Sequence, residues 1–341
     1  MRSENPLLEQ GAIEGCSGGI LNPTFTTSPT AAQDGFAQLI FRGDSTPGRG
    51  TLRRVSLNKD GTSIDDYLGI ALSPEMNGTS HDSYSLEDPR AYMHRDPVTN
   101  EEGIYLVYVG WNGKQRAELP DSPPDTRNML AVAYGPNFDR FHRLGQLFHD
   151  DMPDKDGSII DIRPDGSVLA ARRPMVGKKW ATYIMKAPNL NSEFEVVDII
   201  PPMYEWGSLR NGPSQFHHVK SVGYVGMLHG VKKQDDNYVY SSGGLLLDEQ
   251  GRLKSISRQP EITPIFADEV KGISGKQVAI CTGMGIFGQG NRKHFTFFYG
   301  RGDWNFGTVE IAYEAFIRHL QSPENSVDPK VKQSLIQNYY S

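Results

Sequence analysis

The segment Ser85-Leu86-Glu87-Asp88-Pro89-Arg90 places two adjacent carboxylates directly before a proline. Proline disfavours the helical conformation in the residue before it and lacks a backbone donor, so we expect Asp88 to be extended, at the start of a strand. A carboxylate held in a fixed direction can act as a general acid. An Asp-Pro pair is also a common turn initiator, and that interpretation stays open at this point.

Polar side chains recur within or beside apolar segments along the rest of the chain. Strands normally avoid charge on a buried face, so this many exceptions predict a polar pocket. Taken singly, each residue has a structural alternative, such as a surface arginine, a hydrogen-bonded core histidine or a solvated turn. The set is Asn22, Arg42, Asp88, Arg90, Lys155, Asp156, Arg173, Arg210, Asn211, His229, Tyr240, Glu269 and Asp303.

The ratio of acids to cations in this set indicates a type of chemistry. A glycosidase needs two carboxylates, one as acid and one as nucleophile or base. A glycoside phosphorylase needs one acid, because inorganic phosphate is itself the nucleophile and cations must hold it. Asp88 together with Lys155, Arg173, Arg210 and His229 fits the second case better.

The elements that would position these residues are strands. Short runs rich in Val, Ile, Tyr and Phe, bounded by Gly, Asn, Asp and Pro, fall into five groups of four. Such a recurrence, at about 55 to 70 residues, predicts an all-β, five-bladed β-propeller, with the first strand of each group innermost. The expected strands are 19–27, 36–42, 51–57 and 67–72; 88–95, 104–111, 129–134 and 140–146; 158–163, 167–173, 180–186 and 194–200; 213–220, 222–229, 238–247 and 253–257; 262–266, 277–282, 294–299 and 308–313.

The domain organisation follows from the same pattern. We expect one catalytic domain over residues 12–315 and a partly helical C-terminal tail over 316–341. A two-sheet sandwich followed by a second domain is the alternative. The proline-rich segment 113–128 predicts a surface loop, and 329–339 predicts a short amphipathic helix that packs on the outside or against a second subunit of a homodimer.

Bulk composition excludes several classes of protein. A hydrophobic fraction of 37% and a charged fraction of 22% are typical of an ordered globular protein. A net charge of -6 supplies no field for nucleic acid or an anionic membrane. Cys16 and Cys281 make no disulfide framework, and no signal peptide or membrane span is evident, so we expect a cytoplasmic protein.

Six short motifs, spread over residues 12–315, together resemble the β-mannoside phosphorylases of glycoside hydrolase family 130. They are Glu87-Asp88-Pro89-Arg90, Lys155-Asp156, Arg172-Arg173-Pro174, Leu228-His229-Gly230, Tyr240 with Leu245-Leu246-Leu247-Asp248, and Phe298-Tyr299-Gly300 with Asp303. The resemblance implies a five-bladed propeller that cleaves β-mannosides with phosphate, inverting the anomeric centre to give α-mannose 1-phosphate, and that also runs in synthesis. The branch that acts on β-1,2-linked mannan fits a cytoplasmic protein.

The resemblance also implies residue roles. Asp88 would be the general acid, acting through the 3-hydroxyl of the bound mannose. Phosphate would be held by Lys155, Arg173, Arg210, His229 and Tyr240, and the sugar by Asn22, Arg42, Arg90, Asp156, Glu269 and Asp303. Lysine at 155 and arginine at 210 exchange the types usual in the family but keep the positive charge. No metal or organic cofactor is implied.

Three alternatives remain. Some members of the family are β-mannosidases that lack these cations and use a carboxylate to activate water. The chain could also be a mannoside-binding propeller without catalysis. A nucleotide-sugar donor is a third alternative, but no motif in the sequence would cradle a nucleotide.

Overall fold

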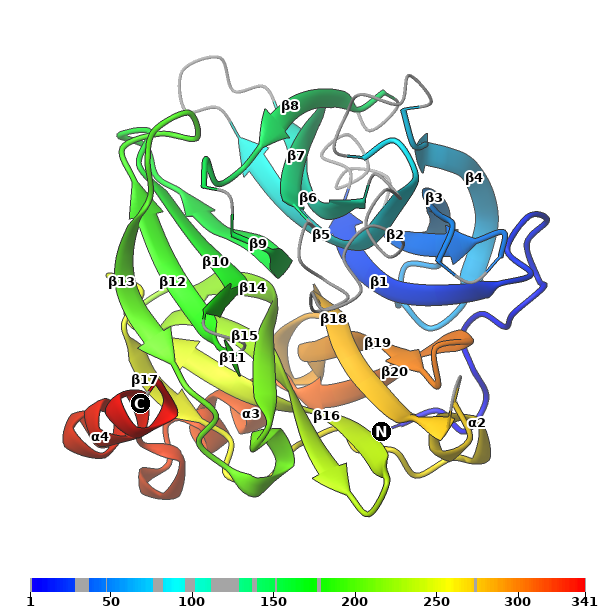
Figure 1. The fold of residues 1–341 in the computed structure, drawn as a ribbon. Coiled ribbons are helices and arrows are strands. Elements are labelled where there is room, and N and C mark those ends of the chain that lie inside the picture. The colour runs from blue at the N-terminus through cyan, green and yellow to red at the C-terminus, as the bar shows by residue number, and fades with distance from the viewer. Residues whose placement is uncertain are drawn as a thin grey trace.

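A computed structural model describes residues 2–27, 37–46, 48–75, 82–95, 102–111, 129–136, 140–150, 152–176, 179–272 and 275–340. The described chain is built mostly of antiparallel strands, with a few short helices (Figure 1). The all-β prediction is therefore confirmed. The predicted loop over 113–128 lies outside the described residues.

The first three groups of strands form three separate sheets. The first sheet holds β1 (Gly19–Thr27), β2 (Ala37–Asp44), β3 (Gly50–Leu57) and β4 (Ile64–Leu72). The second holds β5 (Ser85–Arg95), β6 (Glu102–Trp111), β7 (Met129–Pro136) and β8 (His142–Gln146). The third holds β9 (Asp154–Ile162), β10 (Val168–Val176), β11 (Lys179–Trp180), β12 (Thr182–Ala187) and β13 (Glu195–Ile200).

The last two groups share one hydrogen-bonded sheet. They are β14 (Arg210–Val219), β15 (Gly223–Gln234), β16 (Asn237–Leu247) and β17 (Leu253–Ile256), then β18 (Gln277–Phe287), β19 (His294–Arg301) and β20 (Asn305–Ala312). A short parallel pairing of Val239–Tyr240 with Gln277–Val278 joins them. The longer helices are α3 (Tyr313–Leu320) and α4 (Pro329–Tyr340), and the short turns are η1 (Glu205–Gly207), α2 (Ala267–Val270), η3 (Gly290–Arg292) and η4 (Pro323–Asn325).

The first strands of the groups meet in the middle of the molecule. Contacts run from β1 to β5, β9, β14 and β18 and back to β1, and Figure 1 shows these five strands around the centre of the view. Gln215 of β14 ties three of the others together: its amide donates to the carbonyls of Phe25 and Ala91 at 2.6 and 3.0 Å and accepts from the Met284 amide at 3.0 Å. One buried side chain thus links four of the five first strands, β1, β5, β14 and β18.

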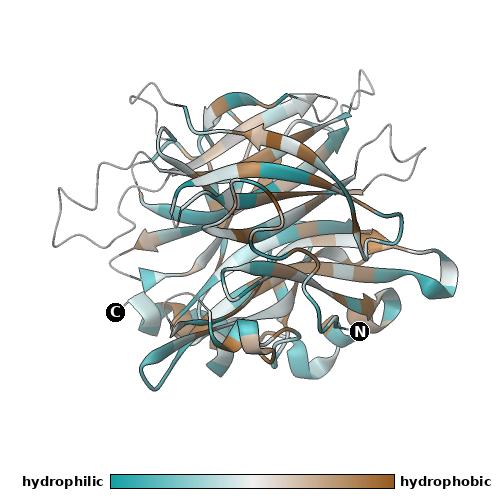
Figure 2. Cartoon of the chain, turned by 90° about the vertical axis from the view of Figure 1, so that its right-hand side faces the viewer, coloured by the Kyte–Doolittle hydropathy of each residue, from teal (hydrophilic) through white to brown (hydrophobic). Residues whose placement is uncertain are grey.

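Apolar side chains fill the spaces between successive sheets. Ile40 and Leu52 of the first sheet pack with Leu86 and Leu106 of the second, and all four are fully buried. Similar clusters lie between the other sheets, and Figure 2 shows the apolar stretches along the strands. Burial of apolar surface is the dominant favourable term in folding, so these layers hold the sheets face to face.

The fifth group of strands differs from the prediction. Residues 262–266 form no strand, and Ile262 makes only an isolated bridge to Ser242. The group instead begins with β18, and its outer edge at β20 is covered by the N-terminal segment, where the Leu7 amide donates to the Phe306 carbonyl at 2.8 Å. An open strand edge leaves backbone groups unpaired, and this segment, which precedes residue 12, pairs them.

The predicted tail helix is present as α4, with Pro329 at its first turn. It packs on the third sheet of its own chain, where the Lys332 ammonium contacts both carboxylate oxygens of Asp198 at 2.5 and 2.7 Å. Among the described helices, none combines the length and the apolar character needed to cross a bilayer.

Candidate active site

Three acidic or amide side chains occupy equivalent bulges in the first strands. Asn22, Asp88 and Asp156 have left-handed backbones, with φ of 49°, 50° and 53°. Each lies at a register shift between its first strand and the next strand of the sheet. Asn and Asp tolerate this conformation better than other non-glycine residues, and a bulge re-aims side chains out of the regular alternation. The expectation that Asp88 is extended is therefore wrong, because the bulge overrides the preference of a residue before proline.

Asp88 is held from two sides. The Asn22 side-chain amide donates to Asp88 Oδ1 at 2.5 Å, and Arg42 Nη1 lies 3.9 Å from the same oxygen. Arg42 is itself fixed by Asp44, to which Nε and Nη2 donate at 2.7 and 2.8 Å. About 12% of the Asp88 side chain is exposed, so the carboxylate is directed but still accessible.

Glu87 links Asp88 to the cationic side of the site. Glu87 Oε2 lies 3.3 Å from Arg42 Nη1 and 3.9 Å from Lys155 Nζ. The sequence interpretation did not assign Glu87 a role in the site. Its position beside Asp88 in the motif was the signal that could have found it.

Asp156 is the centre of the basic cluster. Its two carboxylate oxygens meet Arg90 Nη2 at 3.2 Å and Arg173 Nη2 at 2.8 Å. Arg173 also lies directly opposite Lys155 in the pairing of β9 with β10. Burial alone would raise the pKa of Asp156, but the guanidinium groups outweigh it and hold the pKa at about 2. Asp156 is thus an anion that orders the cations around it.

His229 joins this cluster from β15. Its Nε2 lies 3.4 Å from Arg173 Nη1 and 3.5 Å from Asp156 Oδ2. Burial, helped by the nearby arginines and opposed by Asp156, lowers the pKa of His229 to about 4. The imidazole is therefore neutral at pH 7, and its contact with Asp156 is not an ion pair. Gly212 permits this approach, because a Cβ there would lie 2.5 Å from His229 Cε1.

Arg210 lies beside His229 without a carboxylate partner in the described part of the chain. Its Nη2 donates to the Tyr240 hydroxyl at 2.8 Å, and its charge acts on the pKa of His229. Arg173 Nε, Arg210 Nε and His229 Nδ1 are buried and have no hydrogen-bond partner among the described residues. An unpaired buried donor costs about 1–3 kcal/mol, so the cluster would be stabilised by an anion or by water.

Two further predicted residues are Asp303, which lies near Asp88, and Arg90, which contacts Asp156. Asp303 is half-buried near Arg42 and Asp88, and burial raises the pKa of its carboxyl group. Arg90 is 1% exposed and its guanidinium is directed at Asp156, so it positions that carboxylate. The prediction that Arg90 contacts the sugar is corrected accordingly.

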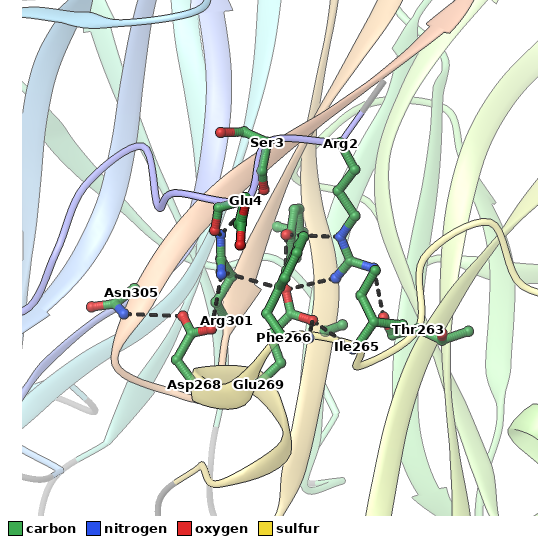
Figure 3. A network of polar contacts seen from close by, with 12 residues as sticks. Arg2, Ser3, Glu4, Thr263, Ile265, Phe266, Asp268, Glu269, Arg301 and Asn305 are labelled. Atoms are coloured by element: carbon green, nitrogen blue, oxygen red, sulfur yellow. Dashed lines mark hydrogen bonds and ion pairs between the residues drawn. The ribbon is translucent and has the colours of Figure 1, made fainter.

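Glu269 lies elsewhere (Figure 3). It is fully buried, and its Oε1 accepts from Arg2 Nη2 at 2.6 Å and from the Tyr299 hydroxyl at 2.9 Å, with Arg301 Nε 3.4 Å away. The prediction that it holds a sugar hydroxyl is wrong. The error follows from taking residues 262–266 as the innermost strand of the last group, whereas β18 holds that place.

The structure therefore gathers most of the predicted set. Asn22, Asp88, Arg42 and Asp303 form the acidic side, and Lys155, Arg173, Arg210, His229 and Tyr240 form the basic side around Asp156. No group of three or more His, Cys, Asp or Glu side chains suited to a metal ion occurs among the residues that the structure describes. Asp88 faces several cations, an arrangement that suits transfer to an anion.

Comparisons with known proteins bear on this arrangement. No family model matches the chain. A 1,2-β-oligomannan phosphorylase of Thermoanaerobacter sp. (strain X514) is 25% identical over 219 residues, which are 63% of this chain and 63% of that relative. The match therefore spans less than two thirds of the relative's length.

Two solved structures share the fold over nearly the whole chain. The β-1,2-mannobiose phosphorylase from Listeria innocua has a TM-score of 0.72 at 16% identity, covering 94% of this chain and 98% of that one. A second structure belongs to the GH130 family of mannoside phosphorylases. That family contains glycoside hydrolases that target β-1,2 mannosidic linkages in Candida mannan. It has a TM-score of 0.67 at 15% identity and covers 96% of this chain and 94% of its own. The comparisons confirm the resemblance to glycoside hydrolase family 130.

Proposed function

We propose that this protein is an inverting β-mannoside phosphorylase, which converts a β-mannoside and phosphate into α-mannose 1-phosphate and a shortened mannoside, and which also runs in synthesis. The observation that carries the proposal is the convergence of Lys155, Arg173, Arg210 and His229 on one side of Asp88. The names of the relatives, a 1,2-β-oligomannan phosphorylase and a β-1,2-mannobiose phosphorylase, support β-1,2-linked manno-oligosaccharides as substrates.

In the proposed reaction a phosphate oxygen attacks the anomeric carbon while the glycosidic bond breaks. The leaving oxygen gains a proton that originates on Asp88 and passes through the 3-hydroxyl of the mannose. Asn22 and Arg42 direct the Asp88 carboxylate. In the bound complex Arg42 donates to sugar hydroxyls and the Asp303 carboxylate accepts from them. This relay allows Asp88 to lie farther from the bond than a direct proton donor.

The basic side neutralises the second reactant. Phosphate carries between one and two negative charges near pH 7, and the four cations Arg90, Arg173, Arg210 and Lys155 exceed the two carboxylates of Asp156 and Glu87. His229 is neutral in the unliganded protein and can donate one hydrogen bond from Nδ1. Preorganised donors of this kind hold an anion and cost no rearrangement during the reaction.

The proposed architecture is a five-bladed propeller formed by one domain with a C-terminal tail. The closed ring of contacts among β1, β5, β9, β14 and β18, and the bulges in them, support five blades. We further propose that the reaction uses no metal or organic cofactor. The free, buried Cys16 and Cys281 fit a reducing, cytoplasmic environment.

Hydrolysis is the alternative to test. Purified protein is incubated with β-1,2-mannobiose with and without phosphate, and the products are identified by ³¹P NMR and sugar chromatography. The proposal expects α-mannose 1-phosphate plus mannose, formed only with phosphate. Two mannose molecules per disaccharide, independent of phosphate, would indicate a β-mannosidase, and binding without turnover would indicate a mannoside-binding propeller.

A further inference from the structure

The C-terminal helix reaches the elements that carry two of the proposed phosphate ligands. Tyr339, in the last turn of α4, accepts a hydrogen bond from the Trp180 amide at 3.2 Å, and its hydroxyl lies 2.9 Å from the Trp180 carbonyl. The same hydroxyl lies 3.3 Å from the Leu209 carbonyl. One phenol therefore contacts the backbone of both β11 and the segment that enters β14.

Each of these contacts adjoins a cation of the site. The Arg173 guanidinium lies over the Trp180 ring, 5.2 Å from its centroid, and Arg210 follows Leu209 directly in the chain. Trp180 is 9% exposed, and it contacts Tyr339 through its backbone and Arg173 through its ring. The charges of both arginines also act on the pKa of the Tyr339 phenol, which burial raises, and this agrees with their closeness.

A second contact seats the tyrosine ring itself. Lys179 Nζ lies 5.2 Å from the centroid of the Tyr339 ring and also contacts the Tyr339 carbonyl. The neighbouring Tyr340 makes a different contact, from its hydroxyl to the Tyr183 hydroxyl at 3.0 Å on β12. Both tyrosines dock α4 on the third sheet, but the contacts of Tyr339 lead to Arg173 and Arg210.

We propose that Tyr339 is a positioning residue of the phosphate site: its hydroxyl fixes Trp180 and Leu209, and through them the orientation of Arg173 and Arg210. This inference rests on the proposed function. It connects the C-terminal helix to the active site, although none of the residues proposed to bind phosphate or sugar lies on α4. A hydrogen bond that holds two charged groups in register affects the binding of their common ligand more than it affects the chemical step.

Tyr339→Phe and Tyr340→Phe form a matched pair, since each removes one hydroxyl from neighbouring positions of the same helix. Phosphate binding is measured by isothermal titration calorimetry with inorganic phosphate, and steady-state kinetics are measured with β-1,2-mannobiose. The net contribution of one hydrogen bond is about 0.5–1.5 kcal/mol, which corresponds to about a 2- to 12-fold change in affinity. We expect Tyr339→Phe to weaken phosphate binding by about that factor and to leave the KM for mannobiose within twofold.

Tyr340→Phe is expected to leave phosphate binding unchanged. It should lower the Tm by about as much as Tyr339→Phe does, because each variant loses one hydroxyl contact of the helix. Equal effects of the two variants on phosphate, or none from Tyr339→Phe, would overturn the inference. A crystal structure of Tyr339→Phe in which Trp180 and Arg173 keep their places would also overturn it. Wild-type protein that binds phosphate without mannoside turnover would refute the proposed function and leave the calorimetric test of Tyr339 valid, whereas wild type that binds no phosphate would overturn both.

Discussion

Replacement of Arg173 by alanine tests the basic side of the site at its best-connected residue. Arg173 pairs with Asp156 Oδ2 at 2.8 Å, contacts His229 at 3.4 Å and stacks over Trp180. A hydrogen bond to a charged group contributes about 1.5–3 kcal/mol. The loss of one strong contact or two weak ones, about 3 kcal/mol, corresponds to a rise of about 100-fold in the KM for phosphate.

The fold should survive this change. Asp156 keeps its ion pair with Arg90 at 3.2 Å, so the buried carboxylate is not left without a partner. Arg173→Lys keeps the charge but loses the planar fork, and we expect about a tenfold rise in the KM for phosphate. The assay is initial-rate phosphorolysis of β-1,2-mannobiose over a matrix of phosphate and mannobiose concentrations.

Arg172 supplies the control, because successive side chains of a strand point to opposite faces. Arg172 donates to Asp154 and to Asp150, and its guanidinium lies 4.3 Å from the Phe148 ring centroid. Arg172→Lys should lower the free energy of unfolding and leave the KM for phosphate nearly unchanged. The reasoning is refuted if Arg173→Ala raises the KM for mannobiose as much as that for phosphate, or if both arginine variants change the phosphate KM equally.

Three further predictions concern the acid, the histidine and the buried carboxylate. Asp88→Asn should lower kcat by about 10²- to 10⁴-fold. The Tm should change little, since asparagine tolerates the left-handed backbone and can still accept a hydrogen bond from Asn22. Near wild-type turnover would exclude Asp88 as the acid. The pKa of His229 is about 4 in the folded protein, against 6.5 ordinarily, so on acidification the unfolded chain binds a proton before the folded protein does. The free energy of unfolding therefore falls by up to about 3 kcal/mol as the pH drops from 6.5 to 4. Urea unfolding at pH 7 and pH 4.5 should therefore show a smaller loss for His229→Gln than for wild type, and parallel losses would contradict this. Glu269→Ala should cost about 3–5 kcal/mol of stability by leaving Arg2 and Arg301 without their shared carboxylate, while the KM for mannobiose stays constant in the folded fraction; a selective rise in that KM would restore Glu269 to the sugar site.

Strand positions were the most predictable feature of this chain. β1 and the first strands of the later sheets combine apolar runs with clear turn residues, such as Pro164-Asp165-Gly166 between β9 and β10. Hydrophobic periodicity and turn chemistry are local properties, so they can be read without tertiary information. The prediction of the tail helix over 329–339 rests on the same kind of signal.

The fifth group of strands was mispredicted because its closure is not local. Residues 262–266 have strand-like composition but make only an isolated bridge, from Ile262 to Ser242, while Arg2–Leu8, with no strand signal, pairs with β20. Sequence alone does not show which distant segment covers a sheet edge. The error carried over to Glu269, whose expected place depended on the assumed innermost strand.

The composition of the site was predictable, but the way it is held together was not. Asp88, Arg173 and His229 could be selected as charged or titratable residues within apolar runs. The bulge at Asp88, with its φ of 50°, runs against the preference imposed by Pro89 and is set by the neighbouring strand. The contact of Tyr339 with Trp180 joins positions 159 residues apart, and no local pattern indicates it.

The most direct measurement is a crystal structure of the protein soaked with phosphate and mannose. The account predicts phosphate bound by Lys155, Arg173, Arg210 and His229, with the mannose between that anion and Asp88 and its 3-hydroxyl directed at the Asp88 carboxylate. Phosphate bound elsewhere, or mannose in this site with the four basic side chains turned away from its anomeric carbon, would contradict it.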